Sequence, residues 1–389
     1  MLHYGVNMNH QRAGLFIHQP SGYKSFIPNQ LPPEPPLEMD AEMIRLLSDA
    51  DRKLGRLDGV TQILPNPDLF VGMYVSKEAV LSSQIEGTQA SMIDLLEANE
   101  NETSITPVGE VVNYVAAMNY GLERMQEFPL SLRLIREIHA YLLQNGRGSA
   151  SNPGEFRTTQ NWIGPAGCTL GTATFVPPAV PDMMEALGDL EKFLYDESDI
   201  PALIKIGMIH AQFETIHPFL DGNGRMGRLL ITFWLCQQQI LTEPLLYLSY
   251  YFKLNRQEYY DRLMNIRTKG QWEEWIKFFL RGVAIVADEA TTSAKEILDL
   301  KARLQVVLYE EGNSNGVNLL EKLFYHPVVT RKLISKLLKV TYPTTGILVE
   351  QFVEKGILMD LNPTRQRNKR YVFSEYLGIL QKGTELARP

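Results

Sequence analysis

The twelve residues from His217 to Arg228 carry the side chains best suited to chemistry in this chain. Their sequence is His-Pro-Phe-Leu-Asp-Gly-Asn-Gly-Arg-Met-Gly-Arg. His217 can accept a proton near neutral pH. The carboxylate of Asp221 is a hard oxygen ligand of the kind that Mg²⁺ prefers. A proton acceptor and a magnesium ligand four residues apart are typical of a site that handles a metal-bound phosphate.

The rest of this segment is suited to binding the phosphate itself. Gly222, Asn223 and Gly224 offer backbone amides to a phosphate, which can come close because the glycines carry no side chain. Arg225 and Arg228 supply planar guanidinium groups that match phosphate oxygens. The segment therefore predicts a site for a nucleotide phosphate bound with Mg²⁺.

Two predicted helices position this segment. Apolar residues recur with a helical period over residues 203–214 and again over 226–234. The segment between them is therefore a tight loop, and the second helix is predicted to start near Asn223 or Gly224. A phosphate at that start would meet unpaired amides and the positive end of the helix dipole. The alternative is an ordinary glycine-rich turn between two helices, which does not need a histidine, an aspartate and two arginines at these offsets.

The pattern His-x-Phe-x-Asp-Gly-Asn-Gly-Arg-x-x-Arg over residues 217–228 resembles the signature of Fic-domain proteins, most of which transfer AMP from ATP to a hydroxyl side chain of a target protein. Residues 153–157, 160–164 and 175–178 resemble the flap of that family, which holds the target as an extended strand. The resemblance covers about residues 30–285, which is most of the chain.

The resemblance implies a role for each motif residue. His217 would be the general base that deprotonates the incoming hydroxyl, and Asp221 would hold Mg²⁺ between the α- and β-phosphates. Arg225 would bind the α/β region and Arg228 the γ-phosphate. The ATP-binding residues implied within the motif are His217, Gly222, Asn223, Gly224, Arg225, Met226, Gly227 and Arg228.

Aromatic residues after the motif are further candidates for nucleotide contacts. The family places a tyrosine pair on the helix that follows the motif, which implies that Tyr259 and Tyr260 contact the adenine or ribose. A companion asparagine in some relatives falls on Arg267 here, so that role is not assigned. His210 is predicted to be buried and hydrogen-bonded, because no third metal ligand follows at a suitable spacing, and His139 is predicted to be a core or helix-contact residue.

A second short element predicts autoinhibition. Ser82 and Glu86, followed by Gly87, lie in a predicted helix over residues 71–89 and share one face of it. They resemble the inhibitory motif of many Fic proteins, in which the glutamate pairs with the second motif arginine, here Arg228. A carboxylate in the phosphate subsite would occupy this arginine and repel the incoming anion. Glu86 is therefore counted among the implied ATP-site residues, where it would block the binding of the γ-phosphate.

Two other interpretations stay open at this point. The same residues could remove AMP from a target, with Glu86 activating water, or transfer another group such as phosphocholine or UMP. In a different class, the Fic fold could be the nucleotide sensor of a transcriptional regulator. The resemblance also implies a protein target, which the sequence does not identify, self-modification and homodimer formation.

The composition is typical of a globular protein with a sizeable core. The chain has 389 residues, 44% of them hydrophobic, and two cysteines that form no metal-type spacing. We found neither an apolar run of membrane-spanning length nor a signal peptide, so the sequence predicts a cytoplasmic protein without membrane contact.

The predicted fold is mainly α, with a Fic helical core, a small β-hairpin in the flap at about 152–180, and a C-terminal α+β module. The predicted parts are an N-terminal arm with a Pro-rich linker (1–37), a helical region with the inhibitory motif (38–110), the Fic domain (111–285), a helical connector (286–326) and a winged-helix-like domain (327–389).

The C-terminal part differs from the rest in charge. Residues 327–389 contain eleven Lys/Arg and five Asp/Glu, a balance of +6 in a chain of net charge −7. Helices are predicted over 328–338 and 342–356, and strands over 357–361 and 370–373. This order resembles a winged helix. It suggests DNA binding or, alternatively, a protein-interaction module, and the basic tip would comprise Arg365, Arg367, Lys369 and Arg370.

Overall fold

The computed structural model describes residues 12–62, 67–97, 107–144, 148–361, 363–365, 369–382 and 384. In these residues the fold is mainly helical, with two small antiparallel sheets, so the predicted fold class is confirmed. The helices that precede the motif loop are α1 (Ala41–Gln62), α2 (Pro67–Ile85), α3 (Met92–Glu97), α4 (Pro107–Arg124), α5 (Leu132–Leu142), α6 (Val180–Leu194) and α7 (Ala202–Ile216). The helices that follow it are α8 (Asn223–Gln237), α9 (Ser249–Leu254), α10 (Arg256–Lys269), α11 (Trp272–Glu310), α12 (Ser314–Tyr325), α13 (Arg331–Leu338), α14 (Tyr342–Glu354) and α15 (Ser374–Gln381).

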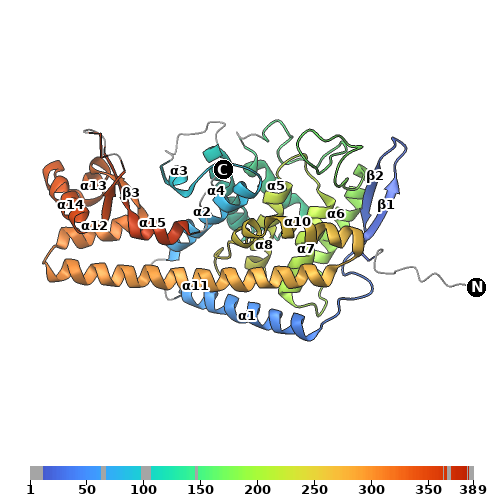
Figure 1. Cartoon of the computed structure of the whole chain (residues 1–389), viewed down its shortest axis with the longest axis horizontal. Coiled ribbons are helices and arrows are strands. Elements are labelled where there is room, and N and C mark those ends of the chain that lie inside the picture. Colours follow the sequence, from blue (N-terminus) through green and yellow to red (C-terminus); the bar gives the residue numbers. More distant parts are fainter. Residues whose placement is uncertain are drawn as a thin grey trace, which may run out of the picture.

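The helices α7 and α8 form the centre of the molecule and pack against each other (Figure 1). Every residue from Leu203 to Ile216 of α7 is buried, and so is every residue from Arg225 to Leu235 of α8. A helix that is buried on all sides lies in the interior of a protein. The loop between the two helices is therefore anchored at both ends by helices that are buried in the core.

A long helix, α11, extends along one side of this core, and α1 lies beside it (Figure 1). The 39 residues of α11 give it a length of about 58 Å at the usual helical rise. It crosses the predicted boundary between residues 285 and 286 without interruption, so the Fic core and the connector share one helix. Among the described residues, no helix is both long and apolar enough to cross a membrane.

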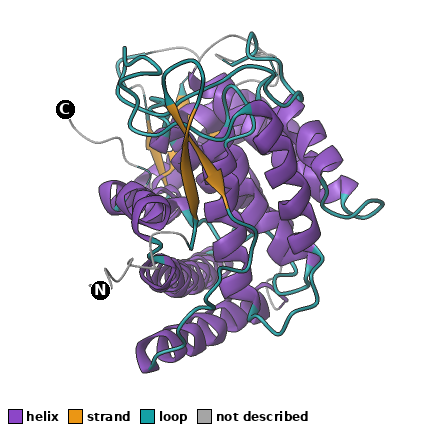
Figure 2. Ribbon diagram, turned by 90° about the vertical axis from the view of Figure 1, so that its right-hand side faces the viewer, coloured by secondary structure: helices purple, strands orange, loops and turns teal. Residues whose placement is uncertain are grey.

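The predicted hairpin in the flap is wrong, and a hairpin occurs instead in the predicted N-terminal arm. In the described residues of the flap, Ile163 and Phe175 form only an isolated bridge. The hairpin comprises β1 (Gly14–His18) and β2 (Lys24–Pro28), and Figure 2 shows it outside the helical layer. Prolines deprive the flap of backbone donors for a ladder. The hairpin is stabilised by packing, since the ring of Phe26 lies 5.8 Å from that of Phe175.

The C-terminal part contains a three-stranded antiparallel sheet with the order β3-β5-β4. Its strands are β3 (Val328–Thr330), β4 (Leu358–Asp360) and β5 (Arg370–Phe373). The predicted helix over 328–338 is thus wrong at its start, because β3 pairs with β5 and the hydroxyl of Thr330 caps α13 by accepting from Leu333 N. Arg367 of the predicted basic tip lies outside the described residues. The winged-helix assignment stays a prediction.

The last helix returns to the core. β5 leads directly into α15, which packs against α11 and α2 (Figure 1). Beyond α15, the carbonyl of Thr384 accepts a hydrogen bond of 2.9 Å from the side chain of Gln84. The C-terminal part therefore contacts the helix that carries the predicted inhibitory motif.

Candidate functional site

The predicted helix–loop–helix around the motif is confirmed. His217 caps the end of α7 in the left-handed region, with φ 49° and ψ 61°, and Gly222 begins α8 with φ 79°. The left-handed region suits glycine but is uncommon for histidine. The loop 217–222 therefore has one strained residue at its start, which other contacts must hold.

Two contacts from the flap hold His217 in this conformation. Its carbonyl accepts hydrogen bonds from Nε of Arg157, at 3.1 Å, and from Nδ2 of Asn161, at 3.2 Å. The amide of Arg157 also donates to the carbonyl of Pro218. Arg157 was part of the flap pattern in the sequence, but its spacing gave no sign that it would bind the loop.

The side chain of Asn223 closes the loop. Its Oδ1 accepts from the amide of Phe219, and its Nδ2 donates to the carbonyl of Phe219, both at 2.8 Å. Both polar groups of the side chain are therefore engaged within the loop. A phosphate contact by Asn223 would have to come from its backbone amide.

The start of α8 has the geometry of an anion site. The first helical hydrogen bond joins the amide of Met226 to the carbonyl of Gly222. The amides of Asn223, Gly224 and Arg225 therefore have no acceptor within the helix. A Cβ at Gly224 would lie 2.3 Å from Oε1 of Glu86. The carboxylate of Glu86 thus lies against the start of α8, where a phosphate is predicted to bind.

Arg228 is held by the predicted inhibitory segment. Its Nη2 donates to Oε1 of Glu86 at 2.6 Å and to the carbonyl of Ser82 at 3.1 Å, and its Nε donates to Oγ of Ser82 at 2.8 Å. Burial favours the protonated form of Glu86, but the charge and hydrogen bond of Arg228 together with the charge of Arg225 outweigh it and lower the pKa of the carboxyl. Gly87 follows with φ 89° and turns the chain away after α2. The sequence-predicted residues Ser82, Glu86 and Arg228 therefore meet at one point.

Arg225 has looser contacts than Arg228. Its Nη2 lies 3.5 Å from Oδ1 of Asp221, and its Nη1 lies 3.8 Å from Oε2 of Glu110. Its Nε is buried and has no hydrogen-bond partner among the described residues. Glu110 in turn accepts a bond of 2.6 Å from the hydroxyl of Thr88. The two carboxylates thus orient Arg225, and its guanidinium still has N–H groups that could donate to a phosphate.

Asp221 lies at the open side of the loop. Its side chain is 36% exposed, and its Oδ1 accepts a bond of 2.6 Å from the amide of Gly222. No cluster of three or more His, Cys, Asp or Glu side chains is present in the part of the chain that the structure describes. A single accessible carboxylate suits Mg²⁺, which commonly binds one or two protein carboxylates and takes its other ligands from phosphate and water.

The electrostatic surroundings keep His217 neutral. Burial lowers the pKa of its imidazole to about 3, and the positive charges of Arg267 and Arg157 act in the same direction. Nδ1 is buried without a hydrogen-bond partner among the described residues. A neutral imidazole at pH 7 has a free lone pair that can accept a proton, as a general base must, and its low pKa makes it a weak base in this state.

A buried carboxyl, which the sequence analysis did not identify, lies beside these groups. Glu214 precedes His217 by three residues in α7, and burial raises its pKa to about 7. Its Oε1 has no hydrogen-bond partner among the described residues, and a Cβ at Gly227 would lie 2.4 Å from it. Gly227 is therefore a packing position against α7. A glutamate one turn before the motif was the only sign of this group in the sequence.

The two tyrosines differ in position. Tyr259 is 1% exposed and bonds through its hydroxyl to Nε2 of His210, whose Nδ1 lies 2.9 Å from the carbonyl of Gly227. Tyr260 is 40% exposed, and the charge of Glu86 raises its pKa, after the larger effect of burial. Met226 is fully buried in the core. Tyr260 is therefore accessible for the predicted nucleotide contact. Tyr259 and Met226 are buried and pack beneath the site.

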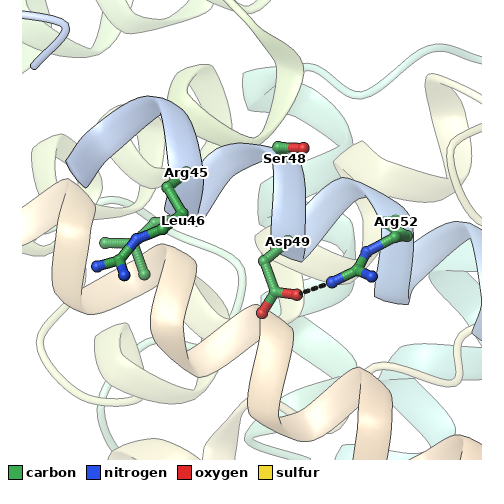
Figure 3. Close-up of a pocket in the computed structure, with 5 residues that line it drawn as sticks. All are labelled: Arg45, Leu46, Ser48, Asp49 and Arg52. Carbon is green, nitrogen blue, oxygen red and sulfur yellow. Dashed lines mark hydrogen bonds and ion pairs between the residues drawn. The ribbon is translucent and has the colours of Figure 1, made fainter. Parts of the chain in front are cut away.

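An open depression of about 450 Å³ lies away from these residues, on the surface of α1. It is lined by Arg45, Leu46, Ser48, Asp49 and Arg52, and Figure 3 shows the ion pair between Asp49 and Arg52. None of the residues considered above lines it.

Comparison with known proteins covers the centre of the chain. Residues 44–123 match the sequence profile described as Fic/DOC family N-terminal, and residues 129–235 match the profile described as Fic/DOC family. Protein adenylyltransferase fic-1 of Caenorhabditis briggsae is 32% identical over 133 residues, which are 33% of this chain and 24% of that protein. Protein adenylyltransferase Fic of Drosophila grimshawi is 30% identical over 131 residues, 33% of this chain and 25% of that protein. The matched segment thus spans about a quarter of these curated relatives.

A solved structure supports the fold over a greater length. The crystal structure of a Fic family protein from Desulfovibrio desulfuricans G20 aligns with 87% of this chain and 97% of its own, with a TM-score of 0.56 and 18% identity. At this identity the similarity concerns the fold alone. The similarity of fold extends to parts of the chain that lie outside the two matched profiles.

Proposed function

Because residues 44–123 and 129–235 match the two Fic/DOC profiles, we propose that this chain is a Mg²⁺-dependent protein adenylyltransferase that its own Glu86 inhibits. The proposed reaction transfers AMP from ATP to a hydroxyl side chain of a target protein. Curated relatives named protein adenylyltransferase support the reaction class. The observation that carries the proposal is the contact of 2.6 Å between Glu86 and Arg228 at the start of α8. A carboxylate that is bonded to Arg228 and lies against Gly224 supports an anion site at this point.

The chemical step requires the removal of one proton. The hydroxyl oxygen of the target would attack the α-phosphorus and form a new P–O bond, while the bond from that phosphorus to the oxygen that bridges to the β-phosphate breaks. Pyrophosphate leaves with the bonding electrons. Nε2 of His217 would take the hydroxyl proton, since Nδ1 is buried and the imidazole is neutral.

Phosphate binding is assigned to the start of α8 and to the two arginines. The free amides of Asn223, Gly224 and Arg225 and the positive end of the helix dipole would hold the α-phosphate. Arg225 has donors to spare for the α/β region, and Arg228 would bind the γ-phosphate. This arrangement stabilises charge and positions the reacting groups, which supplies most of the catalysis in phosphoryl transfer.

Asp221 is the residue that would hold Mg²⁺. Its carboxylate is accessible and adjoins the proposed phosphate site, so its chemistry and its place fit the ion. When bound, the ion would neutralise phosphate charge.

Inhibition would result from direct competition. Glu86 already occupies Arg228 and lies against Gly224, so a γ-phosphate has to displace it. Ser82 adds two contacts to the same guanidinium, which keeps Arg228 turned toward α2.

Labelling with radioactive nucleotides tests the proposal. The Glu86→Gly variant should label itself, or a protein in a cell lysate, with α-labelled ATP more strongly than the wild type. Parallel reactions with CTP, GTP and UTP report the nucleotide preference. The double variant Glu86→Gly/His217→Ala should lose the label, while its melting temperature should stay within a few degrees of that of Glu86→Gly. Equal labelling of wild type and Glu86→Gly would count against inhibition, and labelling of the double variant would count against His217 as the base.

A second activity is favoured by the order of elements in the C-terminal part. The order of helix α12, strand β3, helices α13 and α14, and strands β4 and β5 resembles that of a winged helix, and for this part of the chain we propose DNA binding. A salt-dependent gel shift with promoter DNA, with and without residues 327–389, tests this activity separately. A shift that is unchanged by the truncation would exclude this module as the DNA-binding element.

A further inference from the structure

His139 of α5 connects the motif loop to the flap, although its sequence context predicted only a buried helix contact. Its side chain is fully buried, and both ring nitrogens are engaged. Nε2 lies 2.9 Å from the carbonyl oxygen of Asp221, and the amide of Gly154 donates to Nδ1 at 3.0 Å. A single side chain therefore bonds the backbone of the proposed magnesium ligand and the first part of the flap.

These two contacts determine the tautomer of the ring. The amide of Gly154 can only donate, so Nδ1 of His139 must be the unprotonated acceptor. The carbonyl of Asp221 can only accept, so the hydrogen must be on Nε2. The neutral Nε2–H tautomer satisfies both partners, and no other form of the ring does.

Packing adds to the hydrogen bonds. The imidazole of His139 stacks on the ring of Phe219, with centroids 3.6 Å apart and planes 7° from parallel. A Cβ at Gly222 would lie 3.2 Å from Nε2, so the edge of the ring also meets the start of α8. The ring thus contacts the loop at three successive points, Phe219, the carbonyl of Asp221 and Gly222.

The flap is held on the same helix. Nε of Arg136, one turn before His139, donates to the carbonyl of Gly154 at 2.8 Å. Gly154 has φ 83°, and a Cβ there would lie 3.1 Å from Ala140 of α5. The flap segment that carries Arg157 is therefore held close to α5, and its position relative to the loop depends on His139.

We propose that His139 is a positioning residue that fixes the backbone of Asp221 so that its carboxylate is directed at Mg²⁺ bound with the nucleotide. The proposal rests on the proposed function, since it concerns the magnesium site of that reaction. A buried histidine with a merely structural role would lower the melting temperature when it is replaced. It would leave the dependence on magnesium unchanged. This difference defines the experiment.

The test compares two replacements of His139 in the Glu86→Gly background. His139→Phe keeps a ring that can stack on Phe219 but loses both hydrogen bonds. His139→Gln loses the ring but keeps one donor and one acceptor. Ile138→Ala, at a fully buried neighbour on α5, is a control that lowers stability without touching the loop contacts.

Binding of α,β-methylene ATP, which cannot release pyrophosphate, is measured by calorimetry over a series of magnesium concentrations. His139→Phe should raise the half-saturating magnesium concentration about tenfold or more, the usual size of an effect on residues that orient a metal ligand. Its affinity for the analogue without magnesium should stay within about twofold of the parent, since the proposal leaves the anion site intact. His139→Gln should recover most of the magnesium dependence, and Ile138→Ala should leave it unchanged.

The outcomes separate this inference from the proposed function. An unchanged magnesium dependence in His139→Phe, with a normal effect in the parent, would overturn the positioning role alone. An equal shift in Ile138→Ala would also overturn it, because general loosening of α5 would then be the cause. A parent that binds the analogue without any magnesium effect would overturn the magnesium-dependent function and, with it, this inference.

Discussion

Replacement of Glu86 by alanine removes the carboxylate that holds Arg228, and the resulting change in ATP affinity can be calculated from the contact. The two side chains are 2.6 Å apart, and 2% of Arg228 and 32% of Glu86 are exposed. A hydrogen bond to a charged group contributes about 1.5–3 kcal/mol. Solvent screens the partly exposed carboxylate, which places this contact near the lower end, at about 1.5–2 kcal/mol. A γ-phosphate that no longer has to displace Glu86 should therefore bind about 10–30-fold more tightly.

The assay is calorimetric titration of wild type and Glu86→Ala with ATP and with ADP in the presence of Mg²⁺. ADP is the matched control, because it lacks the γ-phosphate that is assigned to Arg228. Its affinity should change by much less than that of ATP. Glu86→Gln fills nearly the same space without a charge, so its ATP affinity should lie between those of the wild type and the alanine variant. The melting temperature of Glu86→Ala should fall, because a buried guanidinium loses a partner.

Two results would refute this reasoning. An equal gain in affinity for ADP and ATP would show that Glu86 does not compete with the γ-phosphate. An unchanged dissociation constant for ATP, together with a lower melting temperature, would show that the contact with Arg228 is structural and not inhibitory.

Three further predictions concern the support of the site. Burial raises the pKa of Glu214 to about 7 from the ordinary value of 4.5, so the folded state binds more protons between these values and its stability falls as the pH rises through them. The free energy of unfolding of the wild type, measured with urea, should be lower at pH 8 than at pH 5 by an amount on the order of 3 kcal/mol. This difference should be absent in Glu214→Gln. Asn223→Ala leaves the amide of Phe219 without its acceptor, while the carbonyl of Phe219 keeps its hydrogen bond from Nδ2 of Asn161, and should lower the free energy of unfolding by about 1–3 kcal/mol, as measured by urea unfolding; an unchanged value would exclude the loop closure. Gln84 lies two residues before Glu86, and Gln84→Ala removes the hydrogen bonds of this side chain to the carbonyls of Thr384 and Ala90. This variant should raise self-labelling by about two- to fivefold or more; unchanged labelling would show that neither contact restrains the inhibitory segment.

The motif loop could be predicted from the sequence because its determinants are local. Helical periodicity on both sides and the glycines between them require a turn near residues 217–222, and the structure has it there. The pairing of Glu86 with Arg228, 142 residues apart in the chain, was reached through the family resemblance and not through spacing. The same limit applies to the hairpin of residues 14–28, whose stability depends on the contact of Phe26 with Phe175.

The sequence by itself determined which side chains share the short loop, since their separation is set by a few bonds and a helical repeat. Only the tertiary structure decided what each of them does there. Asn223 turns its side chain inward to the loop, Tyr259 enters the core beside His210, and His139 reaches the carbonyl of Asp221. For Tyr259 and His139 the hydrogen-bond partners are 49 and 82 residues away in the chain, and they become neighbours only when the helices pack.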